Sequence, residues 1–230
     1  MTQTQSVDGQ VVLVTGAAGA LAGGVVAAFE DADATVAGVD IVDPAEVETG
    51  ASRYLQADLT DEAAVEATVD AVVEEMGSLD ALVNIAGTWR GGDPVAATPL
   101  ETFDLLVDVN LKTMFLTSKH AIPHLRDSGG AIVSISAKSA LAGGAGDAIY
   151  RATKAGVKIL TESIAVEEDA VRANAILPKV IDTPMNREMM PDADHAAWPT
   201  PAAIAQVILF LCSDAAGVTS GASVPVYGDA

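Results

Sequence analysis

The 230-residue sequence contains little cysteine and few basic residues. Cys212 is its only cysteine, so no disulfide can form within the chain, and a reducing compartment such as the cytoplasm is expected. Because Cys212 ends the apolar run 204–212, we expect it in the core and not as a nucleophile. Only 12 residues are Lys or Arg, whereas 32 are Asp or Glu, which gives a formal net charge of -20. Such an acidic surface repels nucleic acids and anionic membranes, so neither is expected as a partner.

Long apolar runs and aromatic side chains are also scarce. No run approaches the roughly 18 residues that span a bilayer, and the start, MTQTQSVDGQ, lacks the basic and apolar regions of a signal peptide. Phe, Trp and Tyr make up 4% of the residues, and no basic stripe with interleaved aromatic residues indicates a nucleic-acid surface. His120 and His124 have a spacing found in metal sites, but no third ligand is evident, so no metal is expected.

The acidic residues belong to a sequence that is half apolar, which is too apolar for a disordered chain. We therefore expect the excess of acid to form a solvated outer shell. Halophilic proteins carry such a shell, so a high-salt cytoplasm is one hypothesis and an ordinary acidic protein is the other.

Apolar runs alternate with amphipathic helical segments along the chain. Strands are expected at 11–14, 34–39, 54–57, 79–83, 131–135, 173–177 and 223–226. Helices are expected at 21–29, 61–76, 99–125, 147–168 and 201–213, and 181–198 is expected to be a mobile loop with a short helix. Apolar strands alternating with helices predict an α/β fold: one doubly wound parallel sheet of about seven strands, with helices on both faces, in a single domain over 1–230. Ligands of such folds bind at the carboxyl ends of the strands.

A glycine-rich turn follows the first expected strand. Gly16 and Gly19 allow the backbone to approach a pyrophosphate, and Ala18 and Leu21 bring backbone N–H groups to the start of the next helix. A turn between a strand and a helix near the N-terminus is the context that a dinucleotide site requires. The competing interpretation is a tight turn without a ligand.

Acidic residues end the second and third expected strands. Asp40 can accept hydrogen bonds from both ribose hydroxyls and would repel a 2'-phosphate, and no Arg or Lys lies between Gly16 and Asp40. These features predict NAD(H), with NADP(H) as the weaker alternative. Asp58, with Leu59 beside it, is a candidate to hold the adenine. The alternative for Asp40 is a cap of the turn that follows it.

Tyr150 and Lys154 lie four residues apart and therefore share one face of a helix. A nearby ammonium group favours the phenolate and lowers the pKa of a tyrosine. Such a tyrosine serves as a general acid or base at a carbon that gains or loses hydride. By itself the pair is weak, since Tyr and Lys side chains also pack together in ordinary helices.

In combination, these residues resemble the short-chain dehydrogenase/reductase family, with its Rossmann fold, over nearly the whole chain. The resemblance implies that Tyr150 is the proton donor or acceptor and that Lys154 lowers its pKa and holds the nicotinamide ribose. It implies that Asn110 holds a water of the proton relay and that Thr183 binds the nicotinamide carboxamide. Further cofactor contacts implied by position are Asn84, Ala86, Gly87, Pro178 and Ile181. The family also implies a homodimer or homotetramer.

The main departure from this family is Ala137, which stands where the family has its catalytic serine. A methyl group cannot donate a hydrogen bond to a substrate oxygen. Ser136 points to the opposite face of an extended strand, and Ser139 could replace the serine only if the loop bends back. Smaller departures are Ala20 and Ala22 in the glycine turn and Lys179 after Pro178.

Three loops resemble dihydropteridine reductases, which are members of the family that lack the serine. The matching stretches are 86–92, 137–146 and, in the third loop, 182–187 and 190–194 with Trp198. On this resemblance Trp89 is a candidate to stack on a flat bicyclic substrate, and Ala137, Lys138 and Met185 are further substrate candidates. The alternative for Trp89 is packing into the core, and Trp198 is expected to be a packing residue.

Three functions remain open from the sequence. The first is NADH-dependent reduction of a conjugated substrate such as quinonoid dihydropterin, with Tyr150 as proton donor. The second is an ordinary carbonyl or alcohol short-chain enzyme, for example of the 3-oxoacyl reductase type. The third is a catalytically silent NAD-binding protein, which Ala137 and the altered glycines would explain.

Overall fold

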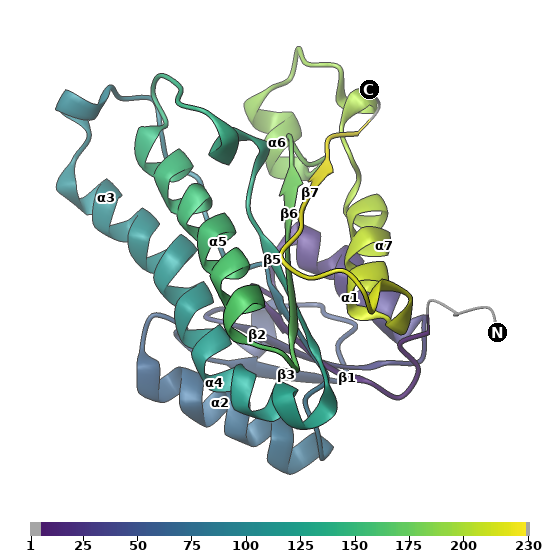
Figure 1. The fold of residues 1–230 in the computed structure, drawn as a ribbon. Helices are drawn as coiled ribbons and strands as arrows, with labels where there is room; N and C mark the ends of the chain where they lie inside the picture. The colour runs from purple at the N-terminus through teal and green to yellow at the C-terminus, as the bar shows by residue number, and fades with distance from the viewer. Residues whose placement is uncertain (1–5, 229–230) are drawn as a thin grey trace.

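The computed structural model describes residues 6–228, and its seven strands form one parallel sheet (Figure 1). The strand order is β3-β2-β1-β4-β5-β6-β7, so the order reverses between β1 and β4. The strands are β1 (Val11–Thr15), β2 (Thr35–Asp40), β3 (Arg53–Gln56), β4 (Ala81–Asn84), β5 (Ala131–Ile135), β6 (Arg172–Pro178) and β7 (Ser223–Val226). This confirms the expected doubly wound α/β fold, and each strand ends within two residues of its expected end.

Helices cover both faces of the sheet (Figure 1). They are α1 (Ala20–Glu30), α2 (Glu62–Met76), α3 (Leu100–Val107), α4 (Thr113–Ser128), α5 (Ala148–Glu167), α6 (Pro184–Met189) and α7 (Pro201–Cys212). One face is covered by α1 and α7, which pack against each other, and the other by α2, α4 and α5. The short helix α6 occupies the segment expected to be a loop with a short helix.

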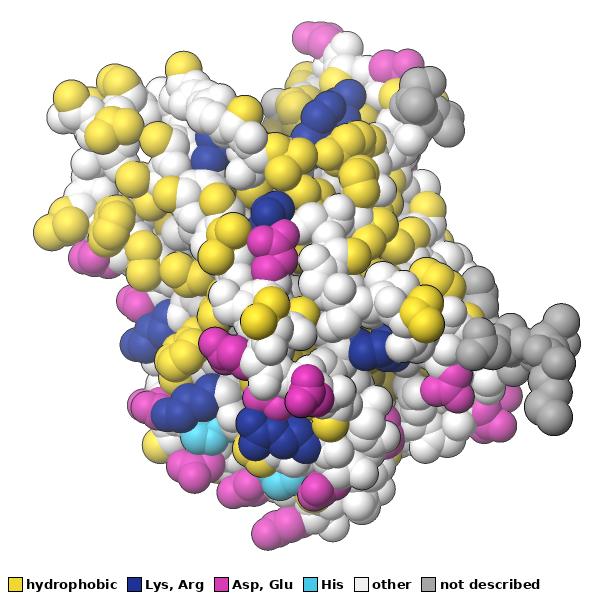
Figure 2. All heavy atoms as spheres, in the orientation of Figure 1, with side chains coloured by type: hydrophobic (Ala, Val, Ile, Leu, Met, Phe, Trp, Pro, Cys, Tyr) yellow, Lys and Arg dark blue, Asp and Glu magenta, His cyan; other side chains and the backbone are white. Residues whose placement is uncertain are grey.

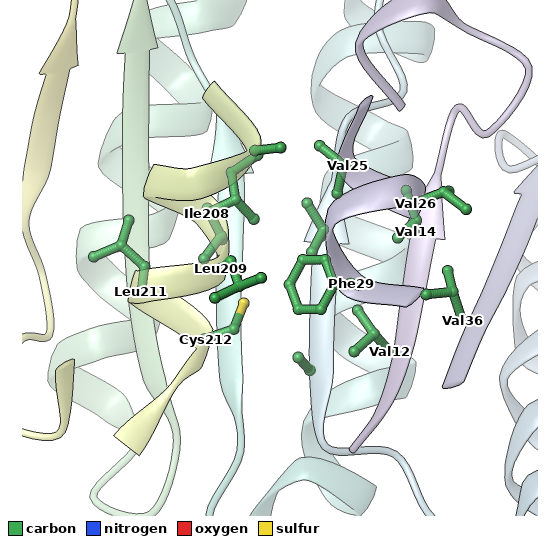
Figure 3. Packing of buried hydrophobic residues seen from close by; sticks show 14 of the residues in the cluster. Val12, Val14, Val25, Val26, Phe29, Val36, Ile208, Leu209, Leu211 and Cys212 are labelled. Carbon is green, nitrogen blue, oxygen red and sulfur yellow. The ribbon is translucent and has the colours of Figure 1, made fainter. Parts of the chain in front are cut away.

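Alternate residues of each strand supply the two cores. On β1, Val12 and Val14 face the cluster with α1 and α7, whereas Val11 and Leu13 belong to the cluster on the opposite face. In Figure 3 the ring of Phe29 on α1 points toward α7. Because both faces of the central strands β1, β4 and β5 are buried, these strands are largely apolar, which is why the sequence reveals them clearly.

The long helical stretch differs from the expectation that it would end near Pro123. It begins as α3, passes through a five-residue π-helical segment at Asp108–Lys112, and continues as α4 through Pro123 to Ser128. Gly129 ends α4 in the left-handed conformation (φ 68), and its N–H donates to the carbonyl of Leu125. A glycine in this conformation is the usual end of a helix, so Gly129 and not Pro123 sets the boundary.

One window is apolar and long enough to span a membrane, which corrects the expectation that no run approaches that length. It is His195–Cys212, with a mean hydropathy of 1.3 and 44% of its residues buried. The window contains a 3-10 turn at His195–Ala197 and the 12-residue helix α7, which packs against α1. Twelve helical residues extend only about 18 Å, well below the roughly 30 Å of a bilayer core. The window is therefore explained by a core helix.

Candidate active site

A cavity of about 620 Å³ opens at the carboxyl ends of the strands, where the strand order reverses. Its volume lies within the roughly 300–1,000 Å³ of small-molecule and cofactor sites. The candidate site residues that line it are Gly16, Gly19, Leu21, Asp40, Asp58, Leu59, Ala86, Gly87, Trp89, Ala137, Tyr150, Lys154, Pro178, Ile181, Thr183 and Met185. Four candidates lie outside the lining: Ala18, Asn84, Asn110 and Lys138.

The glycine turn forms one end of this cavity. Gly16 has a φ of +70, and a Cβ on it would lie 2.9 Å from the backbone of Ala86, so no side chain fits there. The hydroxyl of Thr15 accepts from the N–H groups of Ile85 and Ala86, at 3.0 and 3.1 Å, which joins the turn to the end of β4. Helix α1 begins after Gly19 and has no acidic residue in its first turn. These features fit a pyrophosphate at the N-terminus of α1.

Asp40 and Asp58 lie together in the lining after β2 and β3. The carboxylate of Asp40 accepts from the N–H of Ala18 at 3.1 Å and from that of Val42 at 3.2 Å. Asp40 therefore both caps the turn and faces the cavity. Hydrogen bonds from the hydroxyl and the N–H of Thr60 lower the pKa of Asp58. The two carboxylates suit ribose hydroxyls and an adenine amino group.

Tyr150 and Lys154 face the cavity from α5. Burial, followed by the charge of Asp147, raises the pKa of Tyr150 to about 12. Burial also lowers the pKa of Lys154 to about 8, and its Nζ donates to the carbonyl of Ile135 at 2.9 Å. Burial and Asp147 act on this phenol in the direction opposite to the expected effect of Lys154, and the role of Lys154 in lowering the pKa of Tyr150 stays a prediction. A phenol that stays protonated at neutral pH can serve as a proton donor.

Asn110 lies in the π-helical segment and is 1% exposed. Its Oδ1 accepts from the N–H of Thr88 at 2.7 Å, and its Nδ2 donates to the Thr88 carbonyl at 3.0 Å and to the Thr153 hydroxyl at 3.2 Å. The side chain thus holds the loop after β4 against α5. Asn84 is likewise turned inward, where it bonds to Thr117 and Ser118. The side chains of both asparagines are occupied with contacts inside the protein, and Asn110 supports the lining through Thr88 without being part of it.

The structure places a methyl group at the position of the family's serine. Ala137 is extended, 6% exposed, and lines the cavity. The hydroxyl of Ser136 donates to the carbonyl of Lys154 at 2.7 Å, so it points away from a substrate, as the alternation of a strand predicts. Ser139 lies in the 3-10 turn Lys138–Leu141, outside the lining. Neither serine stands in for the missing hydroxyl.

The substrate candidates divide into two groups. Trp89 is 43% exposed and lines the cavity, so the alternative of core packing is wrong, whereas Trp198 is buried as expected. Met185, 70% exposed, also lines the cavity. The Nζ of Lys138 lies 4.7 Å from the ring centroid of Tyr227, at the rim and not in the lining.

Sequence reasoning missed several lining residues. They are Ala20, Ile41, Ala57, Thr60, Ile85, Thr88, Val109, Thr113, Ile135, Ser136, Lys179, Pro184 and Asn186. Most adjoin a residue that was named, so the neighbours of each strand end were a usable signal. Val109 and Thr113, four apart on the helical stretch, had no signal without the fold. Cys212 is buried, as expected, and burial raises its pKa to about 12.

Comparison with known proteins connects this geometry to one family. A family model described as enoyl-(acyl carrier protein) reductase matches residues 16–228. A short-chain type dehydrogenase/reductase from Mycobacterium ulcerans has the same fold, with a TM-score of 0.90 and 28% identity over 97% of this chain and 90% of that chain. The chain is a short-chain dehydrogenase/reductase. Members of this family are oxidoreductases that use NAD(P)(H).

Relatives of this short-chain dehydrogenase/reductase cover it from end to end. It is 32% identical to the 3-oxoacyl-(acyl-carrier-protein) reductase FabG of Thermotoga maritima, over 96% of this chain and 97% of that protein. It is 33% identical to cis-4-hydroxycyclohexanecarboxylate dehydrogenase of Sinomonas cyclohexanicum, over 95% of each. The structure of carveol dehydrogenase from Mycobacterium avium in complex with NAD matches with a TM-score of 0.87 and 26% identity, over 97% of this chain and 98% of that chain. These relatives are named for alcohol and carbonyl chemistry and not for dihydropteridine reduction.

Proposed function

We propose that this chain transfers hydride between NAD(H) and a carbonyl or alcohol carbon of a small organic substrate. The observation that supports this most is one cavity with a dinucleotide turn at one end and Tyr150 with Lys154 at the other. Bound NADH would supply the hydride that a carbonyl carbon accepts, and Tyr150 would give its phenolic proton to the oxygen, which yields the alcohol and NAD⁺. The named relatives favour this substrate class over conjugated imines.

A preference for NADH is supported by the charges at the adenosine end. Asp40 and Asp58 line the cavity there, and the basic residues in the lining are Lys154 and Lys179, after β5 and β6. In this part of the lining a 2'-phosphate would meet carboxylate groups and no basic side chain. The cytoplasm remains the proposed compartment, since Cys212 has no partner for a disulfide.

Ala137 favours a second candidate, reduction of a flat conjugated imine such as quinonoid dihydropterin. Such a substrate takes hydride at one end and a proton at the other, and no alkoxide develops that a serine must stabilise. Trp89 could stack on the flat ring system from the loop after β4. The two candidate functions therefore differ in whether a hydroxyl group at position 137 would increase the rate of turnover.

NADH and NADPH oxidation with ketones, a 3-oxoacyl thioester and quinonoid dihydropterin would separate the candidates. For carbonyl substrates, Ala137→Ser adds a donor to the developing oxyanion and should raise kcat/KM about 10-fold, a modest share of what such donors contribute. Ala142→Ser, at an exposed position of the same loop, is the matched control. Tyr150→Phe should abolish turnover and retain NADH binding.

Each result has a distinct meaning. Fast dihydropterin turnover, with no gain from Ala137→Ser, would replace the first candidate by the second. NADH binding without turnover of any substrate would contradict both and leave a silent NAD-binding protein.

A further inference from the structure

Most basic side chains of this acidic protein form ion pairs with Asp or Glu, but a few exposed ones do not. All 12 Lys and Arg residues lie within the described range 6–228. Seven form ion pairs with Asp or Glu: Arg53, Lys112, Lys119, Arg126, Arg151, Lys158 and Arg187. Of the rest, Lys154 is buried in the active site, and Arg172 donates to backbone carbonyls at the end of α7. Three exposed cations remain without an ion pair in this range: Arg90, Lys138 and Lys179.

These three cations lie at the carboxyl end of the sheet. They occur in the loops after β4, β5 and β6, which are neighbouring strands. Each adjoins a residue that lines the cavity: Arg90 follows Trp89, Lys138 follows Ala137, and Lys179 follows Pro178 and itself lines the cavity. The unpaired positive charge is therefore at the substrate end, whereas Asp40 and Asp58 are at the β2 and β3 end.

Lys138 and Lys179 converge on the end of β7. The Nζ of Lys138 lies over the ring of Tyr227, and the backbone N–H of Lys179 donates to the carbonyl of Val226 at 3.3 Å. Two adjacent residues, the last of β7 and the one after it, thus contact the side chain of Lys138 and the backbone of Lys179, so both lysines lie on the same side of the cavity. Arg90 is on the loop at the other side, where its guanidinium donates to the carbonyl of Trp89 at 2.9 Å.

Two acidic residues near these loops are paired with arginines. Asp182 is bound by Arg187 through both carboxylate oxygens, and Asp147 by Arg151 at 2.6 Å. Asp93 lines a small cavity with Arg90 but forms no ion pair within residues 6–228. In Figure 2, Asp and Glu gather on the lower half of the molecule, over α2 and α4, and are sparse on the largely apolar upper half. A protein of net charge -20 thus leaves unpaired cations at its substrate mouth.

We propose that the substrate carries an anionic group, a carboxylate or a phosphate, that Lys138 and Lys179 hold while its reacting carbon lies beside Tyr150. The inference rests on the proposed oxidoreductase function. An exposed ammonium group attracts either anion as a point charge, with up to three N–H donors, and a cleft with one sign of charge raises the local concentration of the opposite ion. A lysine without an ion pair at the cavity opening can bind the anionic group of a substrate, whereas a lysine that is already paired with Asp or Glu is neutralised.

The test compares substrates that differ only in charge. Calorimetry with NAD⁺ present, so that no hydride is transferred, would give the affinities of 3-oxobutanoate and 3-oxobutanamide. We expect the wild-type protein to bind the carboxylate more tightly. In Lys138→Gln/Lys179→Gln the ratio of the two affinities should fall about 25-fold, taking about fivefold for each exposed ammonium. The preference should also weaken at high ionic strength.

A matched control removes the same charge elsewhere. Lys119→Gln/Lys158→Gln lowers the net charge equally, on α4 and α5, at residues paired with Glu62 and Glu162. This variant should keep the wild-type affinity ratio. Circular dichroism would verify that both double variants are folded.

Assays of NADH oxidation then distinguish a phosphate from a carboxylate on the substrate. They also distinguish failure of this inference from failure of the proposed oxidoreductase function. A preference for a 3-oxoacyl coenzyme A thioester over the same acyl group on N-acetylcysteamine indicates phosphate, and a preference for 3-oxobutanoate over its amide indicates carboxylate. Equal affinity for the anionic and neutral partners, or a preference that survives Lys138→Gln/Lys179→Gln, would overturn the inference. A charge preference in binding with no turnover of any substrate would contradict the proposed function alone.

Discussion

At the scale of single residues, the pKa of Tyr150 responds to Asp147 as well as to burial. Burial raises the pKa of Tyr150 first, and the charge of Asp147 raises it further. Arg151 partly neutralises that charge through its contact with Asp147 at 2.6 Å. Asp147 and Arg151, four residues apart, thus act on the phenol together, and both can be changed without altering Tyr150 itself.

Opposite changes to this ion pair should shift the pH profile in opposite directions. Asp147→Asn removes a negative charge, which lowers the pKa of Tyr150. In alcohol oxidation the phenolate is the base, so the rising limb of kcat/KM should move to lower pH, by up to about one unit. Arg151→Gln leaves Asp147 unneutralised, which raises the pKa and moves the limb to higher pH.

Both variants break the same ion pair, so a purely structural role would affect them alike. The pH dependence of kcat/KM with a neutral alcohol and NAD⁺ is the measurement. Shifts in the same direction for the two variants would contradict an electrostatic role of Asp147.

At the scale of elements, the sequence predicted the bounds of strands most accurately where all residues of a strand are buried. The expected strand 131–135 coincides with β5, whose five residues are all buried, since a buried parallel strand needs an apolar run of its own length. The strand 223–226 also coincides with β7, although β7 is only partly buried. The continuation of α4 beyond Pro123 was missed because local propensity cannot weigh a proline against the packing of a whole helix. The inward turn of Asn84 and Asn110 was also missed, because it depends on partners such as Thr88 and Thr117 that lie far away in sequence.

The π-helical segment should matter for catalysis through the loop that it holds. Asn110→Ala would leave the partly buried N–H and carbonyl of Thr88 without these partners, which costs about 1–3 kcal/mol in the free energy of unfolding. Because this loop carries Gly87 and Trp89 into the cavity, kcat/KM should fall as well. Urea unfolding and steady-state kinetics would measure the two effects.

Asn174 offers a matched control for that loss. It is also a buried asparagine that bonds to the backbone of a loop, through Thr219 and Ala222, and it lies outside the cavity lining. Asn174→Ala should destabilise the protein by a similar amount while kcat/KM stays near the wild-type value at a temperature where both variants are folded. An equal loss of kcat/KM in both variants would contradict a specific role for Asn110.

At the scale of the whole molecule, charge is the property that departs most from an ordinary member of its fold. The net charge is -20, and the halophilic hypothesis stays a prediction. The homodimer or homotetramer also stays a prediction; apolar side chains exposed on α3, α4 and α5, such as Phe103, Phe115 and Ile159, are those that a second copy would cover. Helix α2 concentrates negative charge on one side. Four acidic residues follow one another there at intervals of four: Glu62, Glu66, Asp70 and Glu74.

Like charges four apart on a helix repel, so this row destabilises the fold when salt is low. Salt screens exposed charges, with a Debye length of about 10 Å at 0.1 M and about 3 Å at 1 M. The free energy of unfolding should therefore rise with potassium chloride.

Glu66→Lys/Glu74→Lys alternates the signs along α2 at exposed positions and should stabilise the protein at low salt by about 1–2 kcal/mol. Urea unfolding at several salt concentrations would show a smaller salt dependence for this variant than for the wild type. Equal salt slopes would mean that salt acts through apolar burial and not through the acidic surface.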